Sequence, residues 1–126
     1  MAYIFVNPNP SNKLTGDCVI RAISLAMNQD WETTYIDIMI QGFMMHDMPS
    51  SNEVWSAYLR KNGFVRRVIP NTCPDCYSTI DFTRDFPEGE YILATGTHVV
   101  AIKDGNYFDT WDSGNEIPIY YWKKEA

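Results

Sequence analysis

The dipeptide Asp104-Gly105, which joins two segments of alternating apolar and polar residues, is the feature that most constrains the fold. This pair favours the positive φ angles of a two-residue type I′ turn, whose twist matches that of antiparallel strands. We therefore expect residues 98–102 and 107–111 to form a β-hairpin. Because a two-residue turn fixes the register, the hairpin also predicts which side chains share a face of the sheet.

Helical patterns precede this hairpin, and strand patterns surround it. Apolar spacing and capping residues predict helices at residues 17–27, 31–45, 50–62 and 78–86, and further strands at 3–6, 64–69, 91–95 and 117–122. Asp30 is the expected cap of the second helix, and Ser50 with Glu53 is expected to form a capping box at the start of the third. Most helices come first and most strands last. This order is typical of an α+β fold, in which N-terminal helices pack against a C-terminal antiparallel sheet. The length of 126 residues suits a single domain over residues 1–126.

Charge and composition exclude several classes of function. Ten basic and sixteen acidic residues give a net charge of −6, which disfavours binding to nucleic acid. No run approaches the roughly 20 apolar residues that cross a bilayer, so we expect no membrane association. Three cysteines and no visible signal peptide favour a cytoplasmic protein with free thiols over a disulfide framework.

Cys18 lies at the start of the most apolar of the predicted helices. Unpaired backbone amides and the helix dipole stabilise a thiolate at this position. Thr15 or Gly16 is the expected N-cap residue, and Asp17 is expected in the first turn, where its negative charge opposes formation of the thiolate. A buried structural cysteine is the alternative interpretation, because free cysteines are commonly core residues.

The predicted hairpin places a histidine close to a carboxylate. In its register Val100 faces Asp109 and His98 faces Trp111, so His98 and Asp109 are diagonal neighbours on one face. An aspartate that accepts a hydrogen bond from one imidazole nitrogen orients the other nitrogen toward a thiol. Trp111 is expected to shield this pair from water. Asp112 is a rival for the carboxylate, but on an unbroken strand it points to the other face.

These residues resemble those of the papain-like cysteine peptidases. The segment Gly16-Asp17-Cys18 opens a buried helix, and the segment Asp109-Thr110-Trp111 follows His98 on the sheet. The resemblance is closest to small bacterial and phage proteins of the bacteriocin-leader-peptidase type. Cell-wall endopeptidases of the NlpC type similarly have Asp directly before the cysteine.

The resemblance implies a papain-like fold with the nucleophile on a central helix. It implies a cysteine-dependent hydrolase, a peptidase or amidase, with Cys18 as nucleophile, His98 as base and Asp109 as the residue that orients it. Asn12, six residues before the cysteine, stands where the papain branch has the glutamine of its oxyanion hole.

A peptide or protein is the expected substrate, and no cofactor or metal is expected. We expect Gly16, Asp17 and Trp111 to contact the substrate. The alternative is a catalytically silent papain-like module that binds a protein partner. Oligomeric state is open.

Two other groups of residues have an ordinary structural interpretation. The pair in Cys73-Pro74-Asp75-Cys76 could contribute to a zinc or redox site, but a loop that holds two thiols is the favoured interpretation. Four methionines, with Phe43 among them, gather near the end of the second predicted helix, and we expect them to fill the core. These are Met39, Met44, Met45 and Met48. A flexible methionine surface that binds apolar partners is the alternative interpretation.

Overall fold

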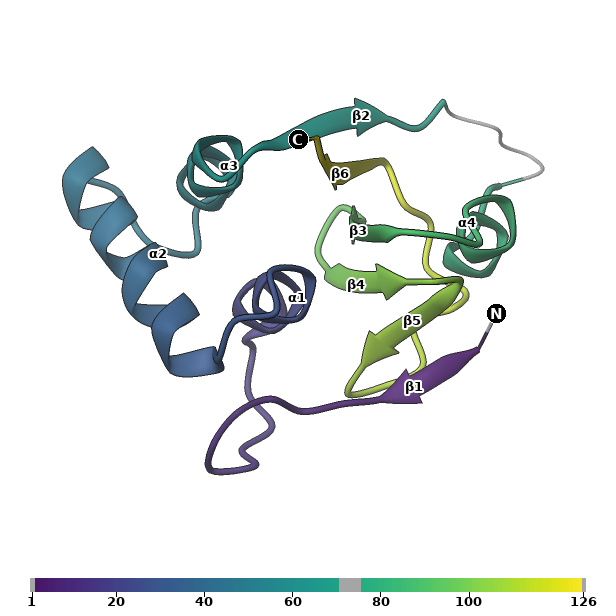
Figure 1. Ribbon diagram of the computed structural model, residues 1–126, viewed down its shortest axis with the longest axis horizontal. Helices are drawn as coiled ribbons and strands as arrows, with labels where there is room; N and C mark the ends of the chain where they lie inside the picture. Colours follow the sequence, from purple (N-terminus) through teal and green to yellow (C-terminus); the bar gives the residue numbers. More distant parts are fainter. Residues whose placement is uncertain (1, 71–75, 126) are drawn as a thin grey trace.

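The computed structural model describes residues 2–70 and 76–125 (Figure 1). Within them the chain forms four helices and six strands and is an α+β protein. In order these are β1 (Tyr3–Phe5), α1 (Cys18–Ala26), α2 (Trp31–Met45), α3 (Asn52–Lys61), β2 (Phe64–Val68), α4 (Thr79–Asp85), β3 (Glu90–Ala94), β4 (Val99–Lys103), β5 (Asn106–Asp109) and β6 (Tyr120–Lys124).

The strands form one sheet in the order β1-β5-β4-β3-β6-β2. The expectation of an antiparallel sheet is wrong in one respect, because β1 pairs with β5 in parallel and the sheet is mixed. A parallel pair needs no tight turn, so no local sequence signal announces it. In this pairing Phe5 lies opposite Asp109, and the Val6 amide donates to the Asp109 carbonyl at 3.0 Å. The chain therefore leaves β1 beside Asp109 on its way to α1.

The hairpin register is confirmed. Asp104 and Gly105 have φ angles of 48° and 77°, as a type I′ turn requires. Lys103 pairs with Asn106. Continued outward, the same register brings His98 opposite Trp111, and the two rings lie 4.7 Å apart between centroids.

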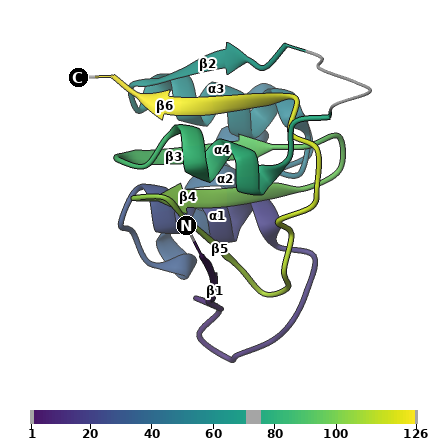
Figure 2. The same cartoon turned by 90° about the vertical axis from the view of Figure 1, so that its right-hand side faces the viewer.

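Helices cover both faces of the sheet (Figures 1 and 2). Helix α1 lies between the sheet and α2, while α4 lies against the opposite face. Alternation along the strands divides the core accordingly, since successive side chains point to opposite faces. Ile92, Ala101 and Trp122 belong to the cluster that packs with α1, and Leu93 and Val100 belong to the cluster on the other face. Helix α1 is thus central, as its apolar sequence predicts.

The helix caps agree with the sequence in part. Asp30 caps α2 by accepting a hydrogen bond from the Thr33 amide at 2.6 Å, and Ser78 with Asp81 forms a capping box on α4. The predicted box on Ser50 is wrong by one residue, because the cap of α3 is Ser51. For α1 the N-cap is Asp17 itself, and neither Thr15 nor Gly16 fills that position.

The expectation that the methionines of α2 fill the core is wrong. Phe43 and Met44 are 78% and 65% exposed, and Met48, just beyond the helix, is 67% exposed. The buried residues of α2 are instead Thr34, Ile38 and Gly42. Ile38 and Gly42 follow Thr34 by four and eight residues, so the three residues form a narrow stripe along one side of α2. The rest of the helix surface lies outside the core.

No helix in residues 2–70 and 76–125 combines the length and the apolar character that a membrane span requires.

Candidate active site

Cys18 is the first residue of α1 and is half-buried. Its thiol is free. Burial raises the pKa of this thiol, but hydrogen bonding by the His98 side chain and the Val99 backbone amide outweighs burial and lowers the pKa below its ordinary value. The cap residue Asp17 makes no side-chain hydrogen bond to the first turn of α1. The amides of that turn are therefore not blocked by the cap and can stabilise negative charge near the sulfur.

His98 lies directly before β4 and is held from several sides. Its backbone amide donates to Thr95 Oγ1 at 3.0 Å, and its carbonyl accepts a hydrogen bond from the Thr95 amide at 2.8 Å. Its ring nitrogen Nε2 lies 2.6 Å from Asp109 Oδ2. Because Nε2 is engaged by the carboxylate, Nδ1 is the nitrogen available to the Cys18 thiol. One face of the ring packs against Trp111, which is 45% exposed.

Asp109 is fully buried at the end of β5, and its carboxylate accepts hydrogen bonds from several neighbouring residues. Oδ2 accepts a hydrogen bond from Ser113 Oγ at 2.7 Å in addition to the contact with His98. Oδ1 accepts from the Thr110 amide at 2.8 Å and from an Arg21 guanidinium nitrogen at 2.9 Å. Burial raises the pKa of Asp109, but the hydrogen bonds from His98, Ser113 and the Thr110 amide, together with the charge of His98, outweigh burial and hold the pKa below its usual range.

Arg21 connects this carboxylate to the start of α1, and the sequence reasoning missed it. The side chain is 4% exposed and bridges Asp109 and Asp17, which lies one helical turn before it. Asp17 in turn accepts a hydrogen bond from Trp31 Nε1 at 2.9 Å. The i, i+4 spacing of Asp17 and Arg21 on an otherwise apolar helix is the signal that could have revealed the pair.

The charge of Asp17 is therefore compensated. Asp17 directly precedes Cys18, and by itself it would oppose a thiolate. Because Arg21 pairs with Asp17, the sulfur is close to a buried cation as well as a buried anion. The positive charge of Arg21 is one of the causes that lower the pKa of Cys18.

The pKa values of Cys18 and His98 move in opposite directions. Burial alone would raise the pKa of the Cys18 thiol, but the hydrogen bonds from His98 and Val99 and the nearby positive charges lower it below its ordinary value. Burial alone would lower the pKa of His98, but hydrogen bonds to Asp109 and Cys18 raise it to about 9. These opposite shifts favour the thiolate–imidazolium form of the pair, and the thiolate is the form that reacts with electrophiles.

Comparisons with protein-family models, with curated proteins and with solved structures find no match for this chain.

The remaining predicted site residues divide into two groups. Gly16 and Asp17 line a cavity at the start of α1, and Trp111 covers His98. Asn12 lies on the exposed loop between β1 and α1, where its backbone amide donates a hydrogen bond to the Asn9 backbone carbonyl at 2.9 Å. Among the described residues no hydrogen bond joins its side chain to Cys18, and its place in an oxyanion hole stays a prediction.

The rival residues have other positions. Asp112 accepts hydrogen bonds from the Tyr107 hydroxyl and from the Gly114 amide, and does not replace Asp109 beside His98. Cys76 is disulfide-bonded, so the expectation that its thiol is free is wrong. Cys73, the other residue of the zinc or redox interpretation, lies outside the described residues.

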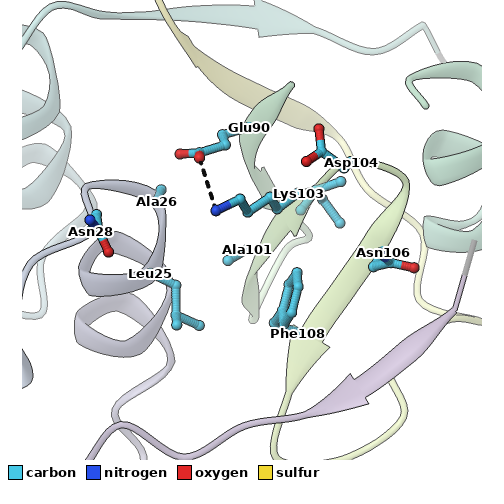
Figure 3. A pocket seen from close by; sticks show the side chains of 10 residues that line it. Leu25, Ala26, Asn28, Glu90, Ala101, Lys103, Asp104, Asn106 and Phe108 are labelled. Carbon is cyan, nitrogen blue, oxygen red and sulfur yellow. Dashed lines mark ion pairs between the residues drawn. The ribbon is translucent and has the colours of Figure 1, made fainter. Parts of the chain in front are cut away.

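Another cavity of the described structure lies away from the thiol. It has a volume of about 420 Å³ and is lined by Leu25, Ala26, Ala101 and Phe108, with an ion pair between Lys103 and Glu90 at its rim (Figure 3). Its helical wall is the C-terminal end of α1, about 12 Å along the axis from Cys18 at 1.5 Å per residue. This cavity is therefore not the one beside the thiol.

We expect Ser113→Ala to lower the free energy of unfolding by about 1.5–3 kcal/mol, because it removes a hydrogen bond to a buried carboxylate. Ser24→Ala is the matched control. Ser24 is equally buried, but its hydroxyl donates to the neutral Arg21 carbonyl, so about 1 kcal/mol is expected. Urea denaturation measures both. Equal losses in the two variants would show that the Asp109 carboxylate does not depend on Ser113.

Proposed function

We propose that this protein is a cysteine-dependent hydrolase, a peptidase or amidase, with Cys18 as nucleophile, His98 as base and Asp109 as the orienting carboxylate. The observation that carries the proposal is that His98 Nε2 lies 2.6 Å from the fully buried Asp109, while the same imidazole is a hydrogen-bonding group that lowers the pKa of the Cys18 thiol. We further propose that the fold is papain-like. A nucleophile that opens a central helix, with the histidine directly before β4 and the aspartate at the end of β5, supports this assignment.

The reaction would proceed in two steps. The Cys18 thiolate attacks the carbonyl carbon of an amide, the C–N bond breaks, and protonated His98 donates its proton to the leaving amine. A thioester to Cys18 remains. Neutral His98 then takes a proton from water, the hydroxide attacks the thioester carbonyl, and the carboxylic acid leaves as the thiolate and imidazolium are restored. An amine in place of water would give transfer instead of hydrolysis.

The oxyanion of each tetrahedral intermediate needs hydrogen-bond donors. The Cys18 backbone amide supports this role, because the N-cap side chain does not occupy the first turn of α1. We keep Asn12 as the proposed second donor, on an exposed loop that can adjust when the substrate binds. A peptide or protein in the cytoplasm is the proposed substrate, and the net charge of −6 argues against nucleic acid.

Alkylation of Cys18 by iodoacetamide across pH tests the proposal. Because the pKa of Cys18 is lowered, we expect rapid labelling well below the ordinary titration range of a thiol. His98→Ala removes the hydrogen bond and the charge that lower this pKa, so the rate near neutral pH should fall on the order of tenfold or more. Mass mapping of the Cys18 peptide gives the rate separately from other cysteines.

His46→Ala is the matched control, since His46 is exposed at the end of α2, far along the chain from the site. It should leave the rate unchanged. Slow labelling of Cys18 at a rate that neither His98→Ala nor His46→Ala changes would contradict the proposed hydrolase.

A silent module that binds a protein partner is the second candidate function. The observation that favours it is the apolar surface of α2, where Ile36, Ile40 and Phe43 are each more than half exposed. The two candidates differ in the labelling result, because partner binding by α2 does not require a reactive thiol.

A further inference from the structure

A cavity between α3 and the strands β2 and β6 contains the least compensated positive charge of the described structure. It has a volume of about 440 Å³. Glu53, Ser56 and Arg60 line it from α3, while Arg66 lines it from β2 and Tyr120 from β6. This volume is within the range of roughly 300–1,000 Å³ that is usual for ligand sites.

The cavity shares a face of the sheet with the thiol but is separate from it. Tyr120 lies opposite Ala94 in the β3–β6 pair, and Ala94 lies opposite Val99 in the β3–β4 pair. Two strand spacings, roughly 10 Å, therefore separate Tyr120 from Val99, the residue next to His98. Cys18 does not line the cavity, so a ligand bound there is recognised by other residues.

The two arginines of the cavity differ from the other three of the chain. Arg21, Arg67 and Arg84 each form an ion pair with a carboxylate. Within residues 2–70 and 76–125, neither Arg60 nor Arg66 has such a partner. In a chain with a net charge of −6, the two guanidinium groups without a carboxylate thus lie in one cavity. Their charge is available to an anionic ligand.

Aromatic rings hold both guanidinium groups in place. Arg60 Cζ lies 5.4 Å from the centroid of the Trp122 ring, and Arg66 Cζ lies 5.2 Å from that of the Tyr120 ring. Tyr120 and Trp122 are two residues apart on β6 and point to one face of the sheet. A guanidinium group that stacks on a ring keeps the N–H donors at its edge. The rings therefore orient the two arginines without using their hydrogen-bonding capacity.

Ser56 supplies a further polar group. It is 7% exposed and lines the cavity, and in the described part of the chain its hydroxyl forms no hydrogen bond. A buried hydroxyl without a partner is unfavourable. An oxygen acceptor that enters the cavity can satisfy this hydroxyl and the two guanidinium groups together. This donor set indicates an oxyanion as the ligand.

The charges of the wall set the charge of the ligand. Arg60 and Arg66 contribute two positive charges and Glu53 contributes one negative charge, which leaves a net charge of +1. A carboxylate matches this charge better than a phosphate group, which carries about −1.5 to −2 charges at neutral pH. Met45 and Ala57 provide an apolar part of the wall, which favours an apolar group attached to the carboxylate.

We propose that this cavity binds a carboxylate attached to an apolar group, with Arg60, Arg66 and Ser56 donating hydrogen bonds to the carboxylate oxygens. A peptide C-terminus with an apolar last residue has this chemistry, and so does a free apolar acid. The inference goes beyond the proposed function and does not depend on it, because no atom of Cys18 takes part in binding.

Titration with N-acetyl-leucine, followed by NMR through the arginine Nε–H resonances, tests the inference. Arg60→Lys and Arg66→Lys assign the two resonances, which should shift in the natural protein as the acid is added. N-acetyl-leucinamide has the same size but no charge, and it should bind on the order of tenfold more weakly. Acetyl-Ala-Ala-Leu with a free carboxylate separates the two sources, since tighter binding than that of N-acetyl-leucine assigns the site to peptide ends.

Variants locate the binding. Arg60→Lys and Arg66→Lys keep the charge but lose the planar donor group, so each should weaken binding on the order of tenfold. Arg67→Lys is the matched control, because Arg67 points to the other face of β2 and pairs with Glu125. Its affinity should equal that of the natural protein. Glu53→Gln removes the negative charge of the wall and should strengthen binding about twofold to fivefold.

Equal binding of the acid and its amide would overturn the inference, as would a loss in Arg67→Lys equal to the losses in the two cavity variants. Tighter binding of inorganic phosphate than of N-acetyl-leucine would overturn the assignment to a carboxylate. Cys18→Ala should bind with unchanged affinity, which separates this result from the labelling test of the proposed function. Circular dichroism of each variant establishes that it is folded.

Discussion

Arg21→Met should lower the free energy of unfolding by about 3–5 kcal/mol, the typical cost when one partner of a buried ion pair is removed. Arg21 is 4% exposed and joins the carboxylates of Asp17 and Asp109, which are 7% and 0% exposed. Methionine fills a similar volume but compensates neither charge. Total stabilities of domains are about 5–15 kcal/mol, so the variant should be close to the limit of folding.

Arg67→Met is the matched control for this prediction. Arg67 pairs with Glu125 at 2.9 Å, but both side chains are about half exposed. Exposed pairs contribute about 0–1 kcal/mol, so this variant should unfold almost as the natural protein does. Denaturation by urea, followed by circular dichroism, compares the two. Similar small losses in both variants would show that Arg21 does not hold the two carboxylates together.

Asp109→Asn should produce a large loss of thiol reactivity, exceeded only by substitution of Cys18 or His98. Asparagine lacks the charge that raises the pKa of His98, so less imidazolium is available to stabilise the thiolate. We expect iodoacetamide labelling of Cys18 at about pH 6 to slow on the order of tenfold or more. In turnover of a substrate the loss should reach about 10²–10⁴-fold, the usual contribution of acid–base catalysis.

Asp112→Asn separates this effect from a general loss of charge. Asp112 lies three residues from Asp109 and accepts a hydrogen bond from the Tyr107 hydroxyl, away from His98. Its amide variant should label at nearly the natural rate. Equal slowing by both substitutions would mean that the nearby charges act diffusely and that Asp109 has no special role.

Local signals in the sequence predicted the parts of the fold that local physics decides. The Asp104-Gly105 turn fixed the hairpin register, and with it the approach of His98 to Asp109, because a two-residue turn leaves no freedom in the pairing. The N-cap at Asp30 was also predicted, because it depends only on a contact with the Thr33 amide three residues along the chain. Ser50 and Ser51 are neighbours of one residue type, so a pattern alone could not choose between them.

The parts that the sequence did not predict depend on distant contacts. Pairing of β1 with β5 joins residues about a hundred positions apart, and no turn residue marks a parallel pair. Arg21 looked like an ordinary polar residue of α1, since its second partner, Asp109, is 88 positions away. The apolar exposed surface of α2 was mistaken for core because composition does not tell which face of a helix finds a neighbour.

Titration of the His98 ring by NMR tests the central claim most directly. The chain has two histidines, so His46→Ala assigns the remaining resonance to His98. A pKa of about 9 is predicted, and it should fall when Cys18→Ala or Asp109→Asn removes a partner that raises it. A midpoint at the ordinary value of about 6.5 that neither substitution moves would contradict the thiolate–imidazolium pair.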